Sequence, residues 1–408
     1  MTTVAEVYKW QFKPRFRRHA FGWKSQPAIT RIKEAVSEIK KVEKKDTVLA
    51  GEGAVCLLER ISPAIEQVDG SSGSIGSAVN YAIETLVPII ASAPAEEKLR
   101  RKWLARLMDA IEADEIPYLE TLSHHWGELC SSAEIASEYA DEYIDALRRL
   151  WSDASNRGSY LKTTTICLSS LLAAKRYDEL RDLLALDKLR FWPYQQFIVR
   201  ALVAQGKRAE AIRHAESCRS QYYEHTSISR LCEEILIDAG FADEAYSRYA
   251  LETSIGMSNI ATYRAIAKKY PHKKPENILR DLIESTPGSE GKWFATAKEL
   301  SFLELAVNVA KMSPCDPRTL TRASRDYIEK DTGFSMCIGL IALHWLIEGY
   351  GYEITGLDVL SAYDYTMQAA EKLGEIDGAR AALSAQLHPH IGSRDGVVKI
   401  LAQKLGLS

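Results

Sequence analysis

Apolar residues recur at helical spacing along almost the whole chain. In the first such segment, which is expected to begin near residue 27, one helix face carries Ile29, Ile32, Val36, Ile39 and Val42. Further helices are expected over residues 48–61 and 78–90 and, after a break at residues 93–94, through residue 151. Alternating runs of β-branched residues, which are typical of strands, are nearly absent. The pattern therefore predicts an all-α protein.

Two segments of the second half repeat at a spacing of 34 residues. AQGKRAEAIRHA (204–215) and DAGFADEAYSRY (238–249) align glycine with glycine, glutamate with glutamate and alanine with alanine: Gly206 and Gly240, Glu210 and Glu244, Ala211 and Ala245. This is the period of tetratricopeptide (TPR) helix–turn–helix units. The glycine is expected to end the first helix in a left-handed cap, and the small alanine to let the second helix pack closely on the first.

Weaker copies flank these two segments. They are KRYDELRDLL, with Glu179 31 residues before Glu210, then SFLELAVNVA, with Glu304 and Ala306, and LGEIDGARAAL, with Gly374 and Ala379. Asp316-Pro317 is expected to cap and begin a further helix. The prediction is a degenerate α-solenoid of TPR-like helical hairpins over residues 160–408.

Residues 1–151 are expected to form an irregular helical N-terminal domain without this period. A Ser/Gly stretch, DGSSGSIGS (69–77), separates two of its helices, and the polar segment SDASNRGS (152–159) is the expected domain boundary.

Several segments resemble an uncharacterised bacterial family of TPR-like helical-repeat proteins of unknown function. They are spread over nearly the whole chain: AFGWKSQPAITRIKEAVSEIKKV, ISPAIEQVDGSSGSIGSAVNYAIETLVPII, HHWGELC, GKWFATAKELS, SPCDPRTLTRASRD and GYGYEITGLDV. The resemblance implies a bacterial cytoplasmic protein. It supplies no catalytic residue.

The amino-acid composition is that of an ordinary folded protein, and it bears on where in the cell the protein is expected. Of 408 residues, 46% are hydrophobic and 26% charged, which argues against wholesale disorder. The longest apolar stretch, 336–347, is too short to span a bilayer and is expected to be a buried helix. The N-terminus lacks a secretion-signal pattern, and the seven scattered cysteines fit reduced, buried thiols. A cytoplasmic protein without a membrane partner is expected.

Charge is unevenly distributed. Residues 13–45, the basic arm, hold eleven Lys or Arg against three Glu, whereas the whole chain has a net charge of −3. At the start of the arm, KPRFRRHAFGWK mixes cations with Phe16, Phe21 and Trp23, and Phe12 immediately precedes it. Such a mixture suits phosphate contacts and stacking on bases, but it equally fits aromatics that anchor the arm on an acidic body. The arm residues expected to meet an anionic partner are Arg15, Arg17, Arg18, Trp23 and Lys24.

Motifs for catalysis or metal binding are weak. DGSSGSIGS lacks the lysine and the preceding strand of a phosphate loop. The densest set of possible ligands is His124, His125, Glu128 and Cys130, in which His124 and Glu128 would share a helix face, but the partner half of a zinc site is missing. We therefore expect no catalytic residue, no metal and no cofactor.

The repeats offer a different kind of site. The predicted first helices of the hairpins, which tend to line the groove of a solenoid, carry Arg200, Arg230, Arg264, Arg322 and Arg325. The favoured hypothesis is a non-enzymatic scaffold that binds a protein or peptide partner in this groove. The alternative is a nucleic-acid-associated protein that uses the basic arm.

Overall fold

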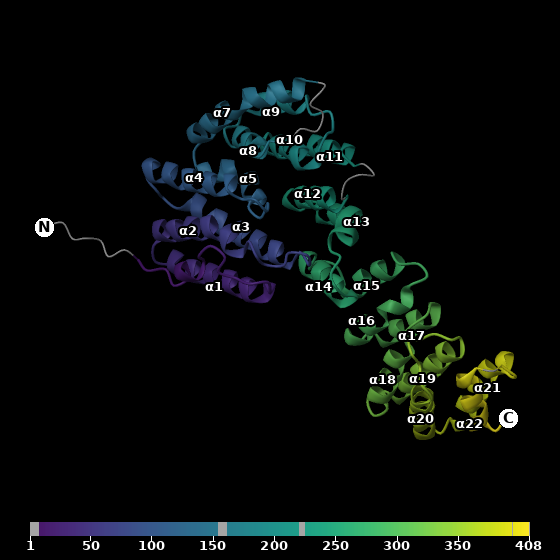
Figure 1. The fold of residues 1–408 in the computed structure, drawn as a ribbon. Helices are drawn as coiled ribbons and strands as arrows, with labels where there is room; N and C mark the ends of the chain where they lie inside the picture. Colours follow the sequence, from purple (N-terminus) through teal and green to yellow (C-terminus); the bar gives the residue numbers. More distant parts are fainter. Residues whose placement is uncertain (1–7, 154–160, 220–224, 394, 408) are drawn as a thin grey trace. The chain divides into compact units, whose positions relative to one another are not determined.

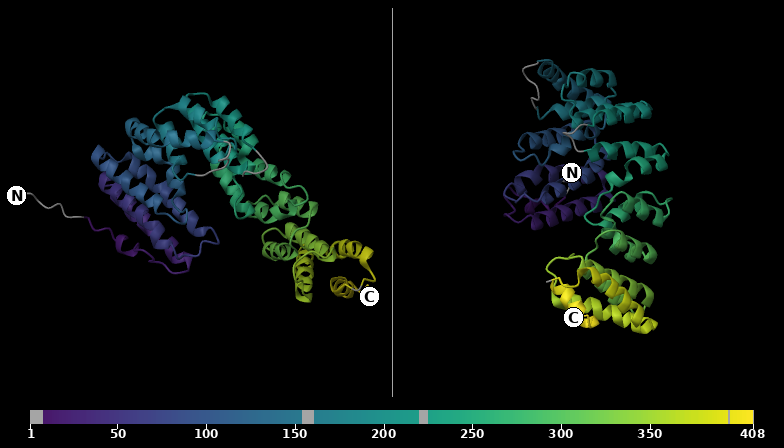
Figure 2. Two further views of the ribbon diagram at one scale, coloured as in Figure 1. Left: turned by 45° about the horizontal axis from the view of Figure 1, so that its top comes forward. Right: turned by 90° about the vertical axis from the view of Figure 1, so that its right-hand side faces the viewer.

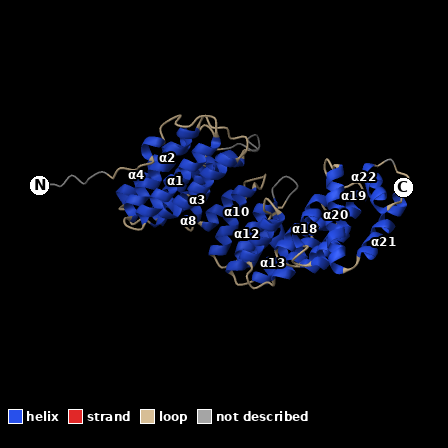
Figure 3. Cartoon of the chain, turned by 90° about the horizontal axis from the view of Figure 1, so that it is seen from below, coloured by secondary structure: helices blue, strands red, loops and turns tan. Residues whose placement is uncertain are grey.

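The computed structural model describes residues 8–153, 161–219, 225–393 and 395–407. Over these ranges the chain forms 22 α-helices, with short 3-10 helices at Lys13–Arg15, Glu290–Trp293 and His388–His390, and no strand. Figure 3 shows this uniform helical content. The all-α prediction is confirmed.

The chain folds into two compact units, Met1–Ile228 and Ser229–Ser408, here called unit 1 and unit 2. Most of the predicted boundary segment, namely its residues 154–159, lies outside the described residues. The helices on either side of it, α7 (Ala133–Ser152) and α8 (Thr164–Ala173), pack against each other inside unit 1.

Unit 1 contains eleven complete helices within the described residues (Figure 1). Besides α7 and α8 they are α1 (Ser25–Glu43), α2 (Thr47–Ile65), α3 (Ser74–Ser92), α4 (Glu97–Glu112), α5 (Glu120–His124), α6 (Trp126–Cys130), α9 (Tyr177–Leu184), α10 (Trp192–Ala204) and α11 (Arg208–Ser217). Helices α1 to α4 lie side by side in Figures 1 and 2, and α2 packs against each of its neighbours α1, α3 and α4.

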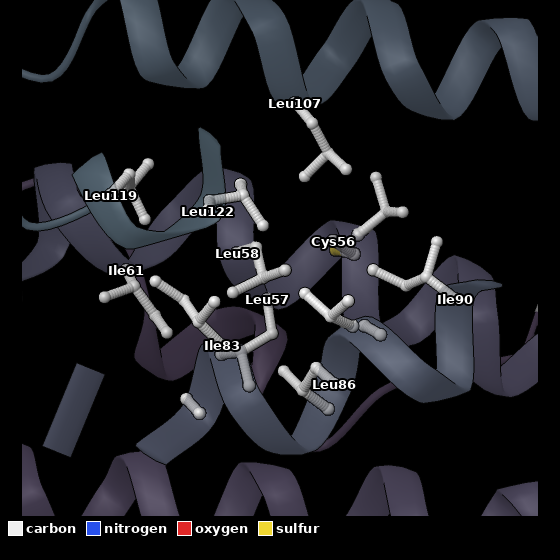
Figure 4. Packing of buried hydrophobic residues seen from close by; sticks show 14 of the residues in the cluster. Cys56, Leu57, Leu58, Ile61, Ile83, Leu86, Ile90, Leu107, Leu119 and Leu122 are labelled. Carbon is white, nitrogen blue, oxygen red and sulfur yellow. The ribbon is translucent and has the colours of Figure 1, made fainter. Parts of the chain in front are cut away.

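The core of unit 1 lies between α2, α3, α4 and α5, where Leu57, Leu86, Leu107 and Leu122 are fully buried (Figure 4). Helix α3 is long and apolar enough to cross a membrane, with a mean hydropathy of 1.3. It, rather than residues 336–347, is therefore the most membrane-like segment among the described residues. Its length and composition are equally those of a core helix, and its apolar side chains are buried against α1, α2 and α6.

Unit 2 continues with helices in sequential pairs. They are α12 (His225–Asp238, which begins just before the division), α13 (Ala242–Thr253), α14 (Asn259–Lys269), α15 (Pro275–Glu284), α16 (Phe294–Glu299), α17 (Leu303–Met312), α18 (Pro317–Tyr327), α19 (Thr332–Ile347), α20 (Gly356–Leu373), α21 (Ile376–Leu387) and α22 (Gly396–Leu405). Within the described part of unit 2, consecutive helices pack on each other in the pairs α14 with α15 and α16 with α17 and from α18 through α22, most extensively α18 with α19 and α19 with α20.

One turn recurs at all five predicted repeat copies. The residues in its left-handed position are Lys175, Gly206, Gly240, Ser301 and Gly374, with φ between +58° and +84°. Each turn has the two bonds of a Schellman motif; at Gly240 these run from Gly240 N to Ile237 O (2.9 Å) and from Phe241 N to Leu236 O (2.8 Å). The predicted role of the glycine is confirmed at positions 206, 240 and 374.

Helix α19 is apolar on nearly every side and is enclosed by α18, α20 and α21. Gly339 lets its backbone approach two neighbours: a Cβ at this position would collide with Thr366 Oγ1 and lie 3.0 Å from Ser324 Oγ. Ser324 and Ser335 also exchange side-chain to backbone hydrogen bonds of 2.9 and 2.7 Å between α18 and α19. The segment 336–347, predicted to be a buried helix, is therefore the centre that holds α18 and α20 together.

Candidate functional site

Three arginines follow one face of α18. Arg318, Arg322 and Arg325 have the i, i+4, i+7 spacing of a single helix face. The helix begins where the sequence predicts, because the Asp316 side chain accepts a hydrogen bond from Thr319 N (2.9 Å) and Pro317 occupies the first turn. Leu320, Ala323 and Ser324 bury the opposite side. The three guanidinium groups are thus presented on one side of a helix that is anchored along its other side.

Helix α20 provides the facing wall. Thr355 and Asp358 form a capping box at its start, and Asp358 also accepts two hydrogen bonds of 2.9 Å from the guanidinium of Arg318. These bonds hold the pKa of the Asp358 carboxyl well below its usual range. Arg318 further donates to the carbonyl oxygen of Glu353 (2.8 Å). Arg318 therefore ties α18 to α20 and to the loop before it.

A hollow of about 230 Å³ lies between these two walls. We call it the arginine pocket; its lining is Pro317, Arg318, Thr321, Arg322, Arg325, Leu346, Asp358, Ser361 and Tyr365. Within the described chain, the hydroxyls of Thr321 and Ser361 have no hydrogen-bond partner. Over the same ranges, Arg322 contacts no carboxylate and donates only to Thr319 Oγ1 (3.1 Å). The pocket thus contains unused donors from both helices.

Arg325 has a partner outside this lining. Its guanidinium lies 2.8 Å from the Asp326 carboxylate, which raises the pKa of Arg325, with a smaller contribution from Tyr365. Arg318 is paired with Asp358 and Arg325 with Asp326, so among the described residues Arg322 is the arginine of the lining that contacts no carboxylate.

Two exposed apolar side chains lie close in the chain to residues that line or adjoin the pocket. The loop between α19 and α20 passes beside it, since Gly351 (φ +109°) lies against Pro317 and Ile354. Tyr352 on this loop is 79% exposed, and Leu357, which precedes Asp358, is 76% exposed.

The five arginines predicted to line a groove all lie on first helices of pairs. They are Arg200 on α10, Arg230 on α12, Arg264 on α14, and Arg322 and Arg325 on α18. Arg322 and Arg325 line a common hollow. Arg264 forms an ion pair of 2.6 Å with Glu299, and Arg200 belongs to unit 1. The sequence reasoning missed Arg318, Ser361 and Tyr365, although the spacing of Arg318 from the other two arginines is visible in the sequence.

The segment that precedes α1, which includes the first part of the basic arm, packs against the other residues of unit 1. Phe12, Phe16 and Phe21 are buried in its core, and the Glu38 carboxylate accepts hydrogen bonds from the backbone N–H groups of Gln11 (2.8 Å) and Phe12 (3.2 Å).

The charged and exposed residues of the arm divide into two groups. Arg15 lies 3.2 Å from Glu34, and Arg18 lies 3.5 Å from Glu66. Arg17, Trp23 and Lys24 remain on the surface, Trp23 with 72% exposure. Three of the four aromatic side chains that could stack on bases are therefore buried in the core.

The predicted helix through His124 and Glu128 is interrupted. Helix α5 ends at His124 and α6 begins at Trp126, so Glu128 lies 3.3 Å from His125 Nδ1 instead of sharing a face with His124. Burial raises the pKa of the Cys130 thiol to about 12. Over the described ranges, no group of three or more His, Cys, Asp or Glu side chains could hold a metal ion.

His124 instead packs parallel to Phe197, with ring centroids 5.9 Å apart. Both line a hollow of about 580 Å³ that also contains His125, Glu128 and Arg200. Burial lowers the pKa of His124 to about 4, with smaller contributions from the charges of His125 and Arg200. His124 is therefore a neutral packing residue at pH 7.

The stretch 69–77 has no phosphate-loop geometry. Helix α3 begins within it at Ser74, earlier than predicted, after Gly73 in the left-handed conformation. The Asp69 carboxylate accepts a hydrogen bond from Ser71 N (3.0 Å). The stretch is a local turn that leads into the helix.

Fold and site together define a helical protein with an arginine-lined pocket between two packed helices. Comparison with known proteins finds no matching family model, no matching curated protein and no matching solved structure. The resemblance to a bacterial helical-repeat family stays a prediction.

Proposed function

We propose that this chain is a non-enzymatic protein-interaction scaffold, built as a degenerate solenoid of TPR-like hairpins, that binds an acidic segment of a partner protein at the arginine pocket. The observation that carries the proposal is the row of Arg318, Arg322 and Arg325 on one face of α18, opposite hydroxyl donors of α20. Guanidinium groups pair with carboxylate and phosphate groups through two parallel hydrogen bonds. Such a row therefore suits an anionic chain.

The solenoid part of this proposal rests on the repeated turns. Five copies with the same pair of hydrogen bonds, each followed by a second helix of the pair, are what a chain of helical hairpins requires. First helices line the inner surface of such arrays, and α18 is the first helix of its pair.

Nucleic-acid binding by the arm has less support. Stacking on unpaired bases needs exposed aromatic rings, and Phe12, Phe16 and Phe21 are buried. Of the aromatics in residues 13–45, only Trp23 is exposed, so we do not propose this alternative as the function.

The test is a binding titration of the full chain with fluorescent glutamate-rich peptides. We expect Arg322→Gln to weaken binding at least about tenfold, since a charge-assisted bidentate contact contributes about 1.5–3 kcal/mol. Arg280→Gln is the matched control: this arginine is exposed on α15 and pairs with Glu276 away from the pocket (2.6 Å). Equal affinities of the wild type and the Arg322→Gln variant would refute the proposal, as would a lack of binding by the wild type.

A further inference from the structure

We infer that the exposed face of helix α1 is a docking surface for double-stranded DNA, which its lysines contact at the backbone phosphates. This face belongs to unit 1, whereas the arginine pocket belongs to unit 2, so the inference goes beyond the proposed function and does not depend on it. It also differs from stacking on unpaired bases, because it needs no aromatic ring of the protein.

Three lysines follow the exposed side of α1. Lys33, Ser37, Lys41 and Lys44 have the i, i+4, i+8, i+11 spacing of one helix face, and all four are exposed. We call them the lysine row; Lys44 is the C-cap residue and still has helical backbone angles. The opposite side of the helix is buried, and the helix packs against α2 and α3. At about 1.5 Å per residue the lysine row is roughly 16 Å long. That length corresponds to about five phosphates of one DNA strand, at about 3.4 Å each along the axis.

The lysine row borders a hollow of about 1180 Å³ between α1, the segment before it and the start of α2. Its lining contains six Lys or Arg and three carboxylates, and each carboxylate is already engaged. Glu34 lies 2.6 Å from Arg31, Glu38 accepts the two backbone hydrogen bonds described above, and Asp46 accepts one from Leu49 N (2.9 Å). Among the described residues, no carboxylate lies within ion-pair distance of a lysine of this lining. The lysine charges are therefore uncompensated.

Exposed lysines of this kind favour a partner of high charge density. An exposed ion pair with a single carboxylate contributes only about 0–1 kcal/mol, because water solvates both groups. Duplex DNA carries one charge per about 1.7 Å of its axis, and it releases condensed counterions when lysines approach its phosphates. An acidic protein segment has no such layer of counterions to release. The lysine row, which contains no apolar side chain, also offers a protein partner nothing to anchor on.

Among nucleic acids, the surface fits a duplex of B form. Single strands are bound largely by stacking of their bases on exposed rings. Of the three rings that line the hollow, Phe12 and Phe16 are buried and Tyr8 is exposed. The major groove of B-form DNA is about 12 Å wide and admits a helix, whereas that of an RNA duplex is deep and narrow. The exposed side of α1 can therefore approach the phosphates that border the groove of DNA.

The experiment titrates the full chain into a short fluorescein-labelled DNA duplex of random sequence and follows the anisotropy between about 50 and 200 mM salt. The wild type should bind, with an affinity that falls steeply as salt is added. Replacing Lys33, Lys41 and Lys44 together with Gln should weaken binding at least about tenfold at the lowest salt. The slope of log K against log [salt] should become shallower by up to about 2.7, since each phosphate contact accounts for about 0.9.

The matched control replaces Lys98, Lys102 and Lys188 together with Gln. These lysines are exposed on unit 1 and do not line the hollow, so the net charge changes by the same amount at a different place. This variant should bind the duplex about as tightly as the wild type. Circular dichroism checks that both variants are folded.

Several results would overturn the inference. If the wild type does not bind the duplex, or if both triple variants lose affinity equally, the lysine row is not a DNA surface. If single-stranded DNA or an RNA duplex of the same length binds as tightly, the surface does not select the partner named here. If poly-glutamate displaces the labelled duplex as well as unlabelled duplex does, the occupant is an acidic protein chain and the inference is wrong.

Discussion

Lys175 and Ser301 adopt the backbone conformation that glycine adopts in the equivalent turns. Their φ angles are +58° and +64°, and both turns contain the same two hydrogen bonds as the turn at Gly240. A side chain in this conformation costs about 1–2 kcal/mol because Cβ crowds the following carbonyl oxygen. These two turns are thus formed against a local steric cost.

Lys175→Gly is expected to raise the free energy of unfolding by about 0.5–1 kcal/mol, since the relieved crowding exceeds the extra chain entropy that glycine loses. Urea denaturation followed by circular dichroism measures the change. Gly206→Ala, the reverse exchange in the next turn, should lower stability by a similar amount. A Lys175→Gly variant that is no more stable than wild type would contradict this account.

The sequence revealed these turns only where glycine marks them. Gly206 and Gly240 identify the repeat because few other residues tolerate a positive φ. Lys175 and Ser301 give no such signal, since their conformation is held by hydrogen bonds from the turn to the carbonyls at the end of the preceding helix. Similarly, Arg318, Arg322 and Arg325 can be placed on one face from their spacing. Their opposite wall cannot, because Asp358 lies 40 residues after Arg318 and is brought there by the packing of α20.

At the scale of elements, the short helix α5 couples stability to pH through His124. Because the pKa of His124 is about 4 in the folded chain and about 6.5 when unfolded, the unfolded state binds more protons between these values. This contribution to stability is fully present above about pH 6.5 and is lost as the pH falls through 4.

The share of the free energy of unfolding that depends on His124 should be about 2 kcal/mol smaller at pH 5 than at pH 7.5. His124→Phe keeps a ring against Phe197 and should remove that share of the pH dependence. Urea titrations at the two pH values, with wild type and variant side by side, give the difference. If both proteins lose stability equally, another group is responsible.

At the scale of the whole molecule, burial is distributed unevenly over the helices of unit 2. Helix α19 buries ten residues, whereas α22 buries only Val398 and Leu401. Repeat-like chains open locally where few contacts hold an element. Unit 2 should therefore open first at its last helix.

Hydrogen exchange should show amides of α22 exchanging much faster than those of α19 under native conditions. Leu401→Ala should accelerate exchange in α22 further and leave α10 in unit 1 unchanged, because the two helices share no core. Uniform protection of α19 and α22, with one common response to the substitution, would show instead that the unit opens all at once.

The enclosure of α19 has a consequence for synthesis on the ribosome. The chain emerges from its N-terminus at about 5–20 residues per second, so α19 appears before α20 and α21, which cover it. For several seconds its apolar surface is only partly covered, by α17 and α18. During this interval an exposed apolar helix of the nascent chain can contact other nascent chains and chaperones that bind apolar segments. Newly made protein is therefore most prone to aggregation while α20 is still being translated.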